Sequence, residues 1–351
     1  MRFHVDADTG AAIGCWVTLD NPIAIPSVIV HASNLEPIEV EATLLRQDIL
    51  DAGLHSTGMV GFIIDESRMP GITQAESVEI FESETKFCIY RRFSKSKNIE
   101  KKLFIFDCSI MPQKNIINNI NNYFAIRHNF VERHGYETII TMIHNYFSKS
   151  IFLTGRPQVT RYVSGLRTMD FTIAALLRNP FEELAERLLF LNLVSKSSAP
   201  ALLSSFMTGL EPAIEFASNL QFDDPRSLNL AFRKLTQQQR LALANPTTRM
   251  LACSLDERVE RRHVTASLDH LSQMDLVGVR SKFAAFSQML GDLMGADVVS
   301  NAEIETFHAL GPLTDTLSRV GSVVDLLEHD LALYSFAEEA VDVGLGEKQS
   351  L

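Results

Sequence analysis

Short runs of alternating apolar and polar residues recur through the first third of the chain. They contain residues 29–30, 40–44, 60–64, 78–81 and 87–90. Turn-forming residues such as Asn34, Gly53 and Gly58 separate them. Alternation with a period of two is typical of half-buried strands, and regularly spaced short strands are typical of sandwiches. The pattern therefore predicts a small β-sandwich-like module over residues 1–92. We expect Trp16, the only tryptophan, in its core, although the ring could also stack on a sugar.

A polar, basic stretch at residues 93–102 is expected to link this module to a second domain. The apolar run at residues 102–106 predicts a strand, and helices are expected at 116–125 and 132–146. A strand, a loop and a helix in this order can hold an anion, because backbone N–H groups and the helix dipole converge at the loop. The alternative is an ordinary turn with a solvent-facing lysine.

Residues 150–194 combine several signals. The pattern predicts a strand, a basic loop, a second strand at the continuous apolar run 171–177, a tight turn and an amphipathic helix. Asn179 suits the helix cap and Pro180 the first helical turn. Arg178 then lies at the carboxyl end of the strand, where open α/β sheets bind ligands.

The rest of the chain has a helical pattern. Asp224 and Pro225 are expected to begin a helix, and residues 304–340 predict a further amphipathic helix. Together the patterns predict an α/β protein. Its β-rich module (1–92) and linker (93–102) precede a parallel-sheet domain (103–345) with a helical carboxyl-terminal part.

The composition narrows the class of protein. Apolar residues make up 46% of the 351 residues and charged residues 21%, which fits a globular protein with a substantial core. No apolar run of about 18 residues predicts a membrane span, and the first residues do not resemble a signal peptide. The four cysteines are scattered and no metal-binding motif is present, so we expect reduced thiols and no metal. The expected location is the cytoplasm, either free or peripheral to the inner membrane.

The charge is uneven along the chain. Residues 91–168 hold 13 Lys and Arg against 4 Asp and Glu, a local balance of 13 − 4 = +9 inside a chain of net charge −11. Clustered cations can form an anion site, or they can be solvated on several faces. Nucleic acid is not expected as a partner, because an acidic protein repels a polyanion and no known binding motif is present.

Several motifs together resemble the carbohydrate sulfotransferases. The segment LLRNPFEELAERL at residues 176–188 resembles their LRdPvERvlSxY strand-to-helix turn, and Gly155-Arg156 stands where they carry Gly-His. NPTTRML at residues 245–251 resembles their N-x-x-T-R-x-L segment. Residues 267–283 resemble their late strand and helix. The resemblance covers roughly residues 102–293 and implies the sulfotransferase fold.

The resemblance also implies a donor, 3′-phosphoadenylyl sulfate, and a set of site residues. Arg178 corresponds to the arginine that contacts the 3′-phosphate, and Arg249 lies in the segment that closes over the nucleotide. Ser109 and Lys114 lie in the loop that would meet the donor phosphates. Clustered arginines could bind an anionic group of the substrate, since a guanidinium holds sulfate, phosphate or carboxylate through a fork of hydrogen bonds. These are Arg156, Arg161 and Arg167.

The chain departs from the family at chemically important positions. The phosphate loop lacks the family's Gly and Thr-Ser pair, Arg156 replaces the histidine and Glu186 replaces a serine. Arginine cannot act as a general base near neutral pH, so no catalytic residue is assigned. The histidines near this region are the remaining candidates for a base. These are His128, His134 and His144.

Two functions follow. The first is transfer of a sulfuryl group to a bacterial surface glycan, either a polysaccharide or a glycolipid. The second is a catalytically degenerate relative that binds a glycan or a partner protein. The place of Glu186 relative to Arg178 and the loop at 109–114 distinguishes them, because a salt bridge in that cleft would argue against nucleotide binding.

Overall fold

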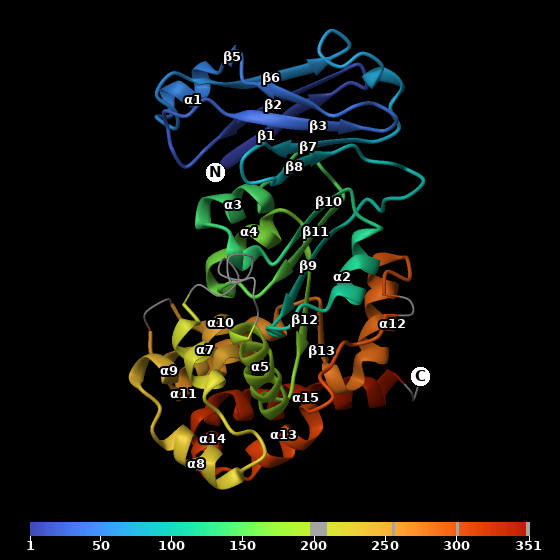
Figure 1. Ribbon diagram of the computed structural model, residues 1–351. Coiled ribbons are helices and arrows are strands. Elements are labelled where there is room, and N and C mark those ends of the chain that lie inside the picture. The colour runs from blue at the N-terminus through green and yellow to red at the C-terminus, as the bar shows by residue number, and fades with distance from the viewer. Residues whose placement is uncertain (197–208, 255–256, 300–301, 349–351) are drawn as a thin grey trace.

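The structure is a computed structural model that describes residues 1–196, 209–254, 257–299 and 302–348. Two antiparallel sheets lie at one end, a parallel sheet lies in the middle, and helices fill the other end (Figure 1). The predicted α/β class is therefore confirmed, with the β-rich module preceding the parallel sheet. None of the helices in the described ranges is long and apolar enough to cross a membrane.

The amino-terminal module is a pair of four-stranded antiparallel sheets, ordered β1-β2-β6-β5 and β4-β3-β7-β8. The strands are β1 (Arg2–Asp8), β2 (Ala12–Thr18), β3 (Ser27–Ala32), β4 (Ile38–Glu41), β5 (Leu44–Leu45), β6 (Met59–Asp65), β7 (Val78–Glu82) and β8 (Cys88–Arg91); the short helix α1 (Gln47–Asp51) and the 3₁₀ turn η1 (Ile72–Gln74) lie between them. The five predicted runs fall in β3, β4 with β5, β6, β7 and β8. The first two strands, β1 and β2, were not among the predicted runs.

Trp16 does not fill the sandwich core as expected. Its neighbours Cys15 and Val17 are buried, whereas Trp16 itself is only partly buried and has the guanidinium of Arg46 5.8 Å from its ring centroid. Side chains alternate along a strand, so a residue between two core residues points to the outer face.

The parallel sheet has the strand order β10-β11-β9-β12-β13. Its strands are β9 (Lys102–Asp107), β10 (Ile126–Asn129), β11 (Ile151–Gly155), β12 (Thr172–Leu177) and β13 (Leu276–Val279). The strands expected at 102–106, at the start of the segment 150–194 and at 171–177 are thereby confirmed. The strand β10 was not predicted. It begins directly after the helix that was expected at residues 116–125, and α2 ends earlier, at Asn121.

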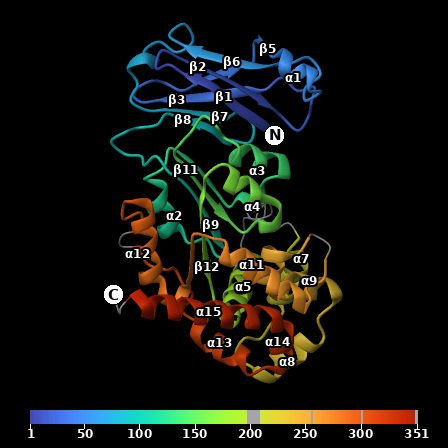
Figure 2. The same ribbon diagram turned by 180° about the vertical axis from the view of Figure 1, so that it is seen from behind.

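Helices cover both faces of the parallel sheet, as the continuous apolar runs of its strands require. One face packs against α2 (Lys114–Asn121) and α12 (Phe283–Met294). The other packs against α3 (Tyr136–Ile143), α4 (Val159–Thr168), α10 (Pro246–Ala252), α11 (Arg261–Ser272) and α15 (Glu328–Lys348), as Figure 2 shows from behind. The 3₁₀ turns η2 (Val131–Arg133) and η3 (Arg280–Lys282) follow β10 and β13.

The expected basic loop after β11 is in fact helical. Val159, Tyr162 and Leu166 are buried along one side of α4, and the polar residues between them hid this short apolar stripe. Gly165 sits where α4 approaches His144, since a Cβ added there would lie 3.2 Å from the Nε2 of that histidine.

The carboxyl-terminal helices form a core of their own around α5 (Pro180–Ser195). The other helices of this core are α7 (Glu211–Ser218), α8 (Pro225–Arg233), α9 (Gln237–Leu243), α13 (Leu310–Ser318) and α14 (Gly321–Leu326). Asp224 accepts a hydrogen bond from the backbone N–H of Arg226, which confirms the predicted start of α8. A single helix over 304–340 is wrong, because three helices divide that range. Asn245 helps to start the third, its Oδ1 accepting from the backbone N–H groups of His329 and Asp330.

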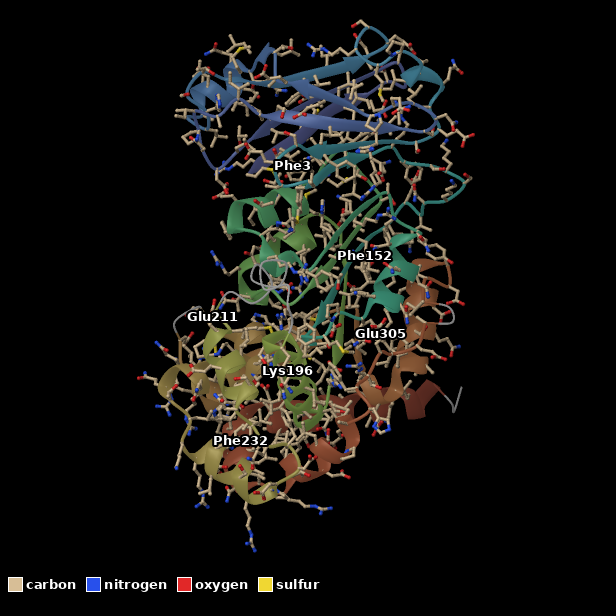
Figure 3. All side chains as sticks on the ribbon, viewed as in Figure 1. Phe3, Phe152, Lys196, Glu211, Phe232 and Glu305 are labelled. Atoms are coloured by element: carbon tan, nitrogen blue, oxygen red, sulfur yellow. The ribbon has the colours of Figure 1, made fainter. Side chains whose placement is uncertain are left out.

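The β module and the parallel-sheet domain share one continuous apolar core. Phe3 and Phe87 of the module contact His128 of β10, and Phe87 stacks on that imidazole with ring centroids 4.6 Å apart. Arg2 also pairs with Glu137 of α3 at 2.7 Å. Figure 3 labels one phenylalanine from each of the three cores: Phe3, Phe152 and Phe232. The expected linker lies between β8 and β9, but the two parts it joins are packed together.

Candidate functional site

The order of the parallel strands identifies where a ligand would bind. From the central strand β9 the chain passes to the edge strand β10, and it later returns to place β12 on the other side of β9. Open α/β sheets bind ligands beyond the carboxyl ends of strands where the order reverses. Four charged residues end or follow strands at this edge: Asp107 ends β9, Arg156 follows β11, Arg178 follows β12 and Arg280 follows β13.

A carboxylate of the chain itself fills this position. Glu186 of α5 contacts the Nη1 of Arg178 through Oε1, and its Oε2 lies 3.5 Å from the Nη1 of Arg280. The side chains of Glu186 and Arg178 are 1% and 2% exposed. The hydroxyl of Ser109 also donates to Glu186 Oε1, at 2.7 Å. Arg178 and Ser109, both predicted to bind the donor, are thus brought together, but around an internal anion.

The loop between β9 and α2 is closed by local bonds rather than open toward a phosphate. Asp107 Oδ1 accepts from the backbone N–H of Ser109 at 2.9 Å. The side-chain amide of Gln113 donates to the carbonyl of Glu305 and accepts from its backbone N–H, at 3.2 and 2.9 Å. Arg280 donates to the same carbonyl at 3.0 Å. The segment around Glu305 is therefore hydrogen-bonded to this loop, and Lys114 is exposed at the first turn of α2.

Burial shapes the electrostatics of this cluster. It raises the pKa of Asp107 to about 6, an effect that the backbone N–H of Ser109 and the charge of Arg280 oppose. Burial also lowers the pKa of the Arg280 guanidinium. Two carboxyl groups thus balance two guanidinium groups in a region with little access to water. An entering phosphate would add negative charge to a site that is already neutralised.

The anion candidate Arg156, at the end of β11, is paired in the same manner. Its Nε lies 3.3 Å from Glu132 Oε1, and its backbone N–H donates to Glu132 Oε2 at 3.0 Å. The carboxylate lies against Gly155, where an added Cβ would come within 2.2 Å of Oε2. Gly155 therefore leaves room for the Glu132 carboxylate, and Arg156 binds it. Glu132 was not among the residues predicted from the sequence.

Arg161 and Arg167 do not join Arg156 in one site. Arg161 lies over the ring of Tyr136, 4.6 Å from its centroid, on the exposed side of α4. Arg167 donates to the side-chain and backbone oxygens of Gln273, both at 2.7 Å. The three arginines therefore contact different residues, because Arg156 precedes α4 and the helix turns Arg161 and Arg167 toward different neighbours.

The N-terminus of α10, part of the segment expected to close over the nucleotide, also holds an internal carboxylate. Asp330 accepts from the backbone N–H groups of Thr247 and Thr248 at 3.0 and 2.7 Å, and burial raises the pKa of this carboxyl. Arg249, the predicted nucleotide contact, instead donates to the carbonyl of Glu257 at 3.0 Å.

None of the three candidate bases makes a hydrogen bond or ion pair with Arg178 in the part of the chain that the structure describes. His128 is on β10, which β11 and β9 separate from β12, so it is roughly 14 Å away at about 4.8 Å per strand. Burial lowers the pKa of His128 to about 3 and also lowers that of His134. His144 follows α3 and its Nδ1 lies 3.4 Å from the hydroxyl of Tyr146. The structure therefore brings none of the three to the expected donor position.

A group with possible metal ligands lies before α11. Cys253, Glu257 and His263 bring one ligand atom each within 4.8 Å of one another. His263 Nδ1 accepts from the backbone N–H of Glu260 at 2.8 Å, so its Nε2 carries the proton that Glu257 accepts at 3.0 Å. Ser254 donates to the other carboxylate oxygen at 3.2 Å. These hydrogen bonds account for the closeness of the Glu257 carboxylate to the His263 imidazole.

Two residues of the cluster were missed although a signal existed. Asp107 and Arg280 come at the end of, or directly after, buried strands, and the rule applied to Arg178 would have found both. Glu132 and Asp330 carried no such signal, because each meets its partners across a long sequence separation.

A scan against protein-family models finds no matching family, and a search of curated proteins finds no match.

Proposed function

We propose that this protein is a non-catalytic relative of the carbohydrate sulfotransferases that binds a glycan without transferring a sulfuryl group to it. The observation that carries the proposal is the burial of Glu186 against Arg178 and Ser109. Sulfuryl transfer needs preorganised cations aimed at the phosphate of the departing nucleotide. In this chain the expected cation already holds a carboxylate.

Two further arrangements support the proposal. Asp330 accepts the N–H groups at the start of α10, which are the donors that an anion at this helix would use. Arg156 stands in place of the family's histidine and is paired with Glu132. Each of these anion-binding groups is thus neutralised within the chain. The expected donor, 3′-phosphoadenylyl sulfate, would have to displace buried ion pairs.

A second candidate is an active sulfotransferase with a divergent donor site, acting on a bacterial surface polysaccharide or glycolipid. The adjacency of Arg178 and Ser109 at the carboxyl edge of the sheet favours it. This reading requires Glu186 to leave Arg178 when the donor binds. The desolvated contact makes that exchange costly, which is why we prefer the non-catalytic reading.

Titration calorimetry with adenosine 3′,5′-bisphosphate separates the two. We expect no binding at about 1 mM nucleotide, a concentration that would reveal an affinity of about −4 kcal/mol or better. Glycan binding is scored separately with the probes described below. Micromolar nucleotide binding that Arg178→Ala abolishes, and that Arg226→Ala on the exposed surface of α8 leaves intact, would overturn the proposal in favour of the enzyme.

A further inference from the structure

A cleft of about 780 Å³ lies between the β module and the parallel-sheet domain. Its walls are the loop at residues 19–24, the β7–β8 turn at 84–88, the end of β10 and the segment leading into α3. This volume lies in the range of small-molecule sites, which occur preferentially where domains meet. The cleft is separate from the cluster around Glu186.

The cleft is basic. Four cationic side chains line it, together with the carboxylates of Asp20 and Glu84, and one of the four, Arg91, is paired with Glu79. These four are Lys86, Arg91, Arg127 and Arg133. The strongly basic stretch of the sequence, residues 91–168, thus contributes three arginines to one concave surface. Cations gathered in a cleft concentrate an attractive potential for anions.

Arg127 distinguishes this cleft from the sites already described. Arg178 and Arg156 each pair with a carboxylate of the chain. Arg127 pairs with none in the described part of the chain, and it uses one N–H to donate to the carbonyl of Asn121 at 3.1 Å. Its other N–H groups remain available, since a guanidinium has five. The side chain is partly buried, and its pKa is lowered by burial and by the nearby charge of Arg91, an effect that the carboxylate of Glu79 opposes without forming an ion pair with Arg127.

Hydrogen-bonding capacity is left over beside Arg127. The Oδ1 of Asn129 and the Nε2 of His128 are buried and make no hydrogen bond with any residue in the described ranges. Buried polar atoms in native proteins nearly always have a partner, and leaving one without costs about 1–3 kcal/mol. Arg127 and Asn129 lie two residues apart on β10, so they point to the same side of the strand. A donor for anions and an acceptor for hydroxyl groups are therefore neighbours.

Aromatic rings border the cleft. The guanidinium of Arg133 lies 4.0 Å from the ring centroid of Phe130, and that of Arg91 lies 5.7 Å from the ring centroid of Phe81. Phe130 has a φ of 60°, a left-handed conformation that is rare for a bulky residue. Strained residues of this kind concentrate at ligand-binding positions. Phe130 is held there at the turn between β10 and η2.

We propose that this cleft binds a saccharide that carries an anionic group. Arg127 holds the carboxylate or sulfate ester, Asn129 accepts from a hydroxyl group, and Phe130 and Phe81 provide apolar surface to the sugar rings. A simple inorganic anion would leave the acceptor at Asn129 unused. The inference rests on the proposed function, because it supplies the ligand that a non-catalytic glycan-binding protein requires.

Calorimetry on the full chain tests the cleft with four probes: trigalacturonic acid, a sulfated galactose disaccharide, neutral galactobiose and sodium sulfate. At least one of the two acidic saccharides is expected to bind, and the comparison between them identifies the preferred anionic group. Galactobiose and sulfate alone are expected to bind at least tenfold more weakly. Arg127→Gln is expected to weaken the acidic saccharide at least tenfold, Asn129→Leu to weaken it severalfold, and Arg226→Gln on α8 to leave it unchanged.

Binding of neither acidic saccharide, equal binding of galactobiose, or full affinity in Arg127→Gln would overturn the cleft assignment. Circular dichroism of each variant separates lost binding from lost folding, and Asn129→Leu provides a second route if Arg127→Gln does not fold. The nucleotide titration is independent of these probes. Saccharide binding at the cleft together with nucleotide binding at Arg178 would uphold the cleft and overturn the non-catalytic reading.

Discussion

The carboxylate of Glu186 contacts the guanidinium of Arg178, and both side chains are almost completely buried. The contact lies at the edge of the parallel sheet where a nucleotide phosphate was expected. The pair joins a residue just before α5 to the second turn of that helix, and Arg280 of η3 lies next to it. It therefore contributes to the packing of the domain as well as to the charge balance at this edge of the sheet.

Breaking this pair should be much more harmful than replacing it. Glu186→Gln removes the nearest counter-charge of Arg178 and leaves it only the longer contact of 3.7 Å to the partly exposed Glu182, so it is expected to lower the free energy of unfolding by about 3–5 kcal/mol. The double variant Arg178→Met/Glu186→Leu removes both charges and should recover a large part of that loss. Urea unfolding measures both. Arg262→Ala is the control, because it breaks an exposed pair with Glu257 that is expected to contribute less than about 1 kcal/mol. An equally small loss of stability in Glu186→Gln would contradict this view.

Asp107 should make stability fall as the pH rises from about 4 to about 6. Its pKa is raised from 3.8 to about 6 by burial, so across this window the folded chain binds more protons than the unfolded chain. Asp107→Asn removes the effect while keeping an acceptor for Ser109. The variant should be more stable at pH 7 by up to about 3 kcal/mol, at 1.36 kcal/mol per pKa unit, and should gain little at pH 4.

Thermal unfolding at a series of pH values gives the comparison. Asp48→Asn is the matched control, because Arg46 lowers the pKa of Asp48 to about 2. The stability that Asp48 contributes is present above pH 3.8 and is lost as the pH falls toward 2, so its removal acts in the opposite direction. Parallel pH curves for Asp107→Asn and the wild type would refute the assignment of Asp107.

Asp330 should be essential to the junction of α10 and α15. Asp330→Ala leaves the backbone N–H groups of Thr247 and Thr248 buried without partners, and a loss of about 2–4 kcal/mol is expected from two such groups. Glu328→Ala, at the exposed start of α15, should change stability by less than about 1 kcal/mol. Hydrogen exchange of α10 is the sharper readout: exchange that is unchanged in Asp330→Ala would disprove the role.

Gly155 should tolerate no side chain. Its φ is +154°, and an added Cβ would lie 2.2 Å from Glu132 Oε2 and 2.8 Å from the backbone nitrogen of Val131. Gly155→Ala must therefore displace the carboxylate that pairs with Arg156, with an expected loss above about 2 kcal/mol. Gly321→Ala meets no atom within 4 Å and serves as the control. Equal midpoints of urea unfolding for the two variants would show that the Glu132 carboxylate moves away from Gly155 without loss of stability.

The single tryptophan provides a test of how the two parts unfold. Trp16 lies in the β module, whereas most helices belong to the rest of the chain. Because one apolar core spans both, Trp16 fluorescence and far-ultraviolet circular dichroism should change at the same urea concentration. Two separated midpoints would mean that the shared core does not couple the module to the parallel sheet.

The sequence predicted the features that depend on near neighbours. Asn179 accepts from the N–H of Phe181 at the start of α5, as the Arg-Asn-Pro turn indicated, and the apolar run before it is β12. The substitution of Glu186 for the family's serine also raised the question of a salt bridge to Arg178. Whether that bridge forms depends on side-chain placement, which a spacing of eight residues allows but does not require.

The features that the sequence did not reveal depend on distant contacts. Glu132 reaches Arg156 across 24 residues, and Asp330 reaches Thr248 across 82. Arg127 became notable only because it forms no ion pair with a carboxylate of the described residues, and that cannot be read from a sequence in which acidic residues outnumber basic ones. The predicted trio of arginines contacts different residues for the same reason, since closeness in sequence did not indicate a common direction.

The stacking of Phe87 on His128 has a consequence for recognition. These residues come from opposite walls of the cleft, and their rings lie nearly parallel at 9° within the shared core. The two walls are consequently preorganised, and a ligand would not need to draw two loosely tethered domains together. Ordering a flexible site on binding costs free energy, and a preorganised site avoids that cost. A small ligand with few contacts can therefore bind, and its affinity should depend on the fit of individual groups rather than on domain closure.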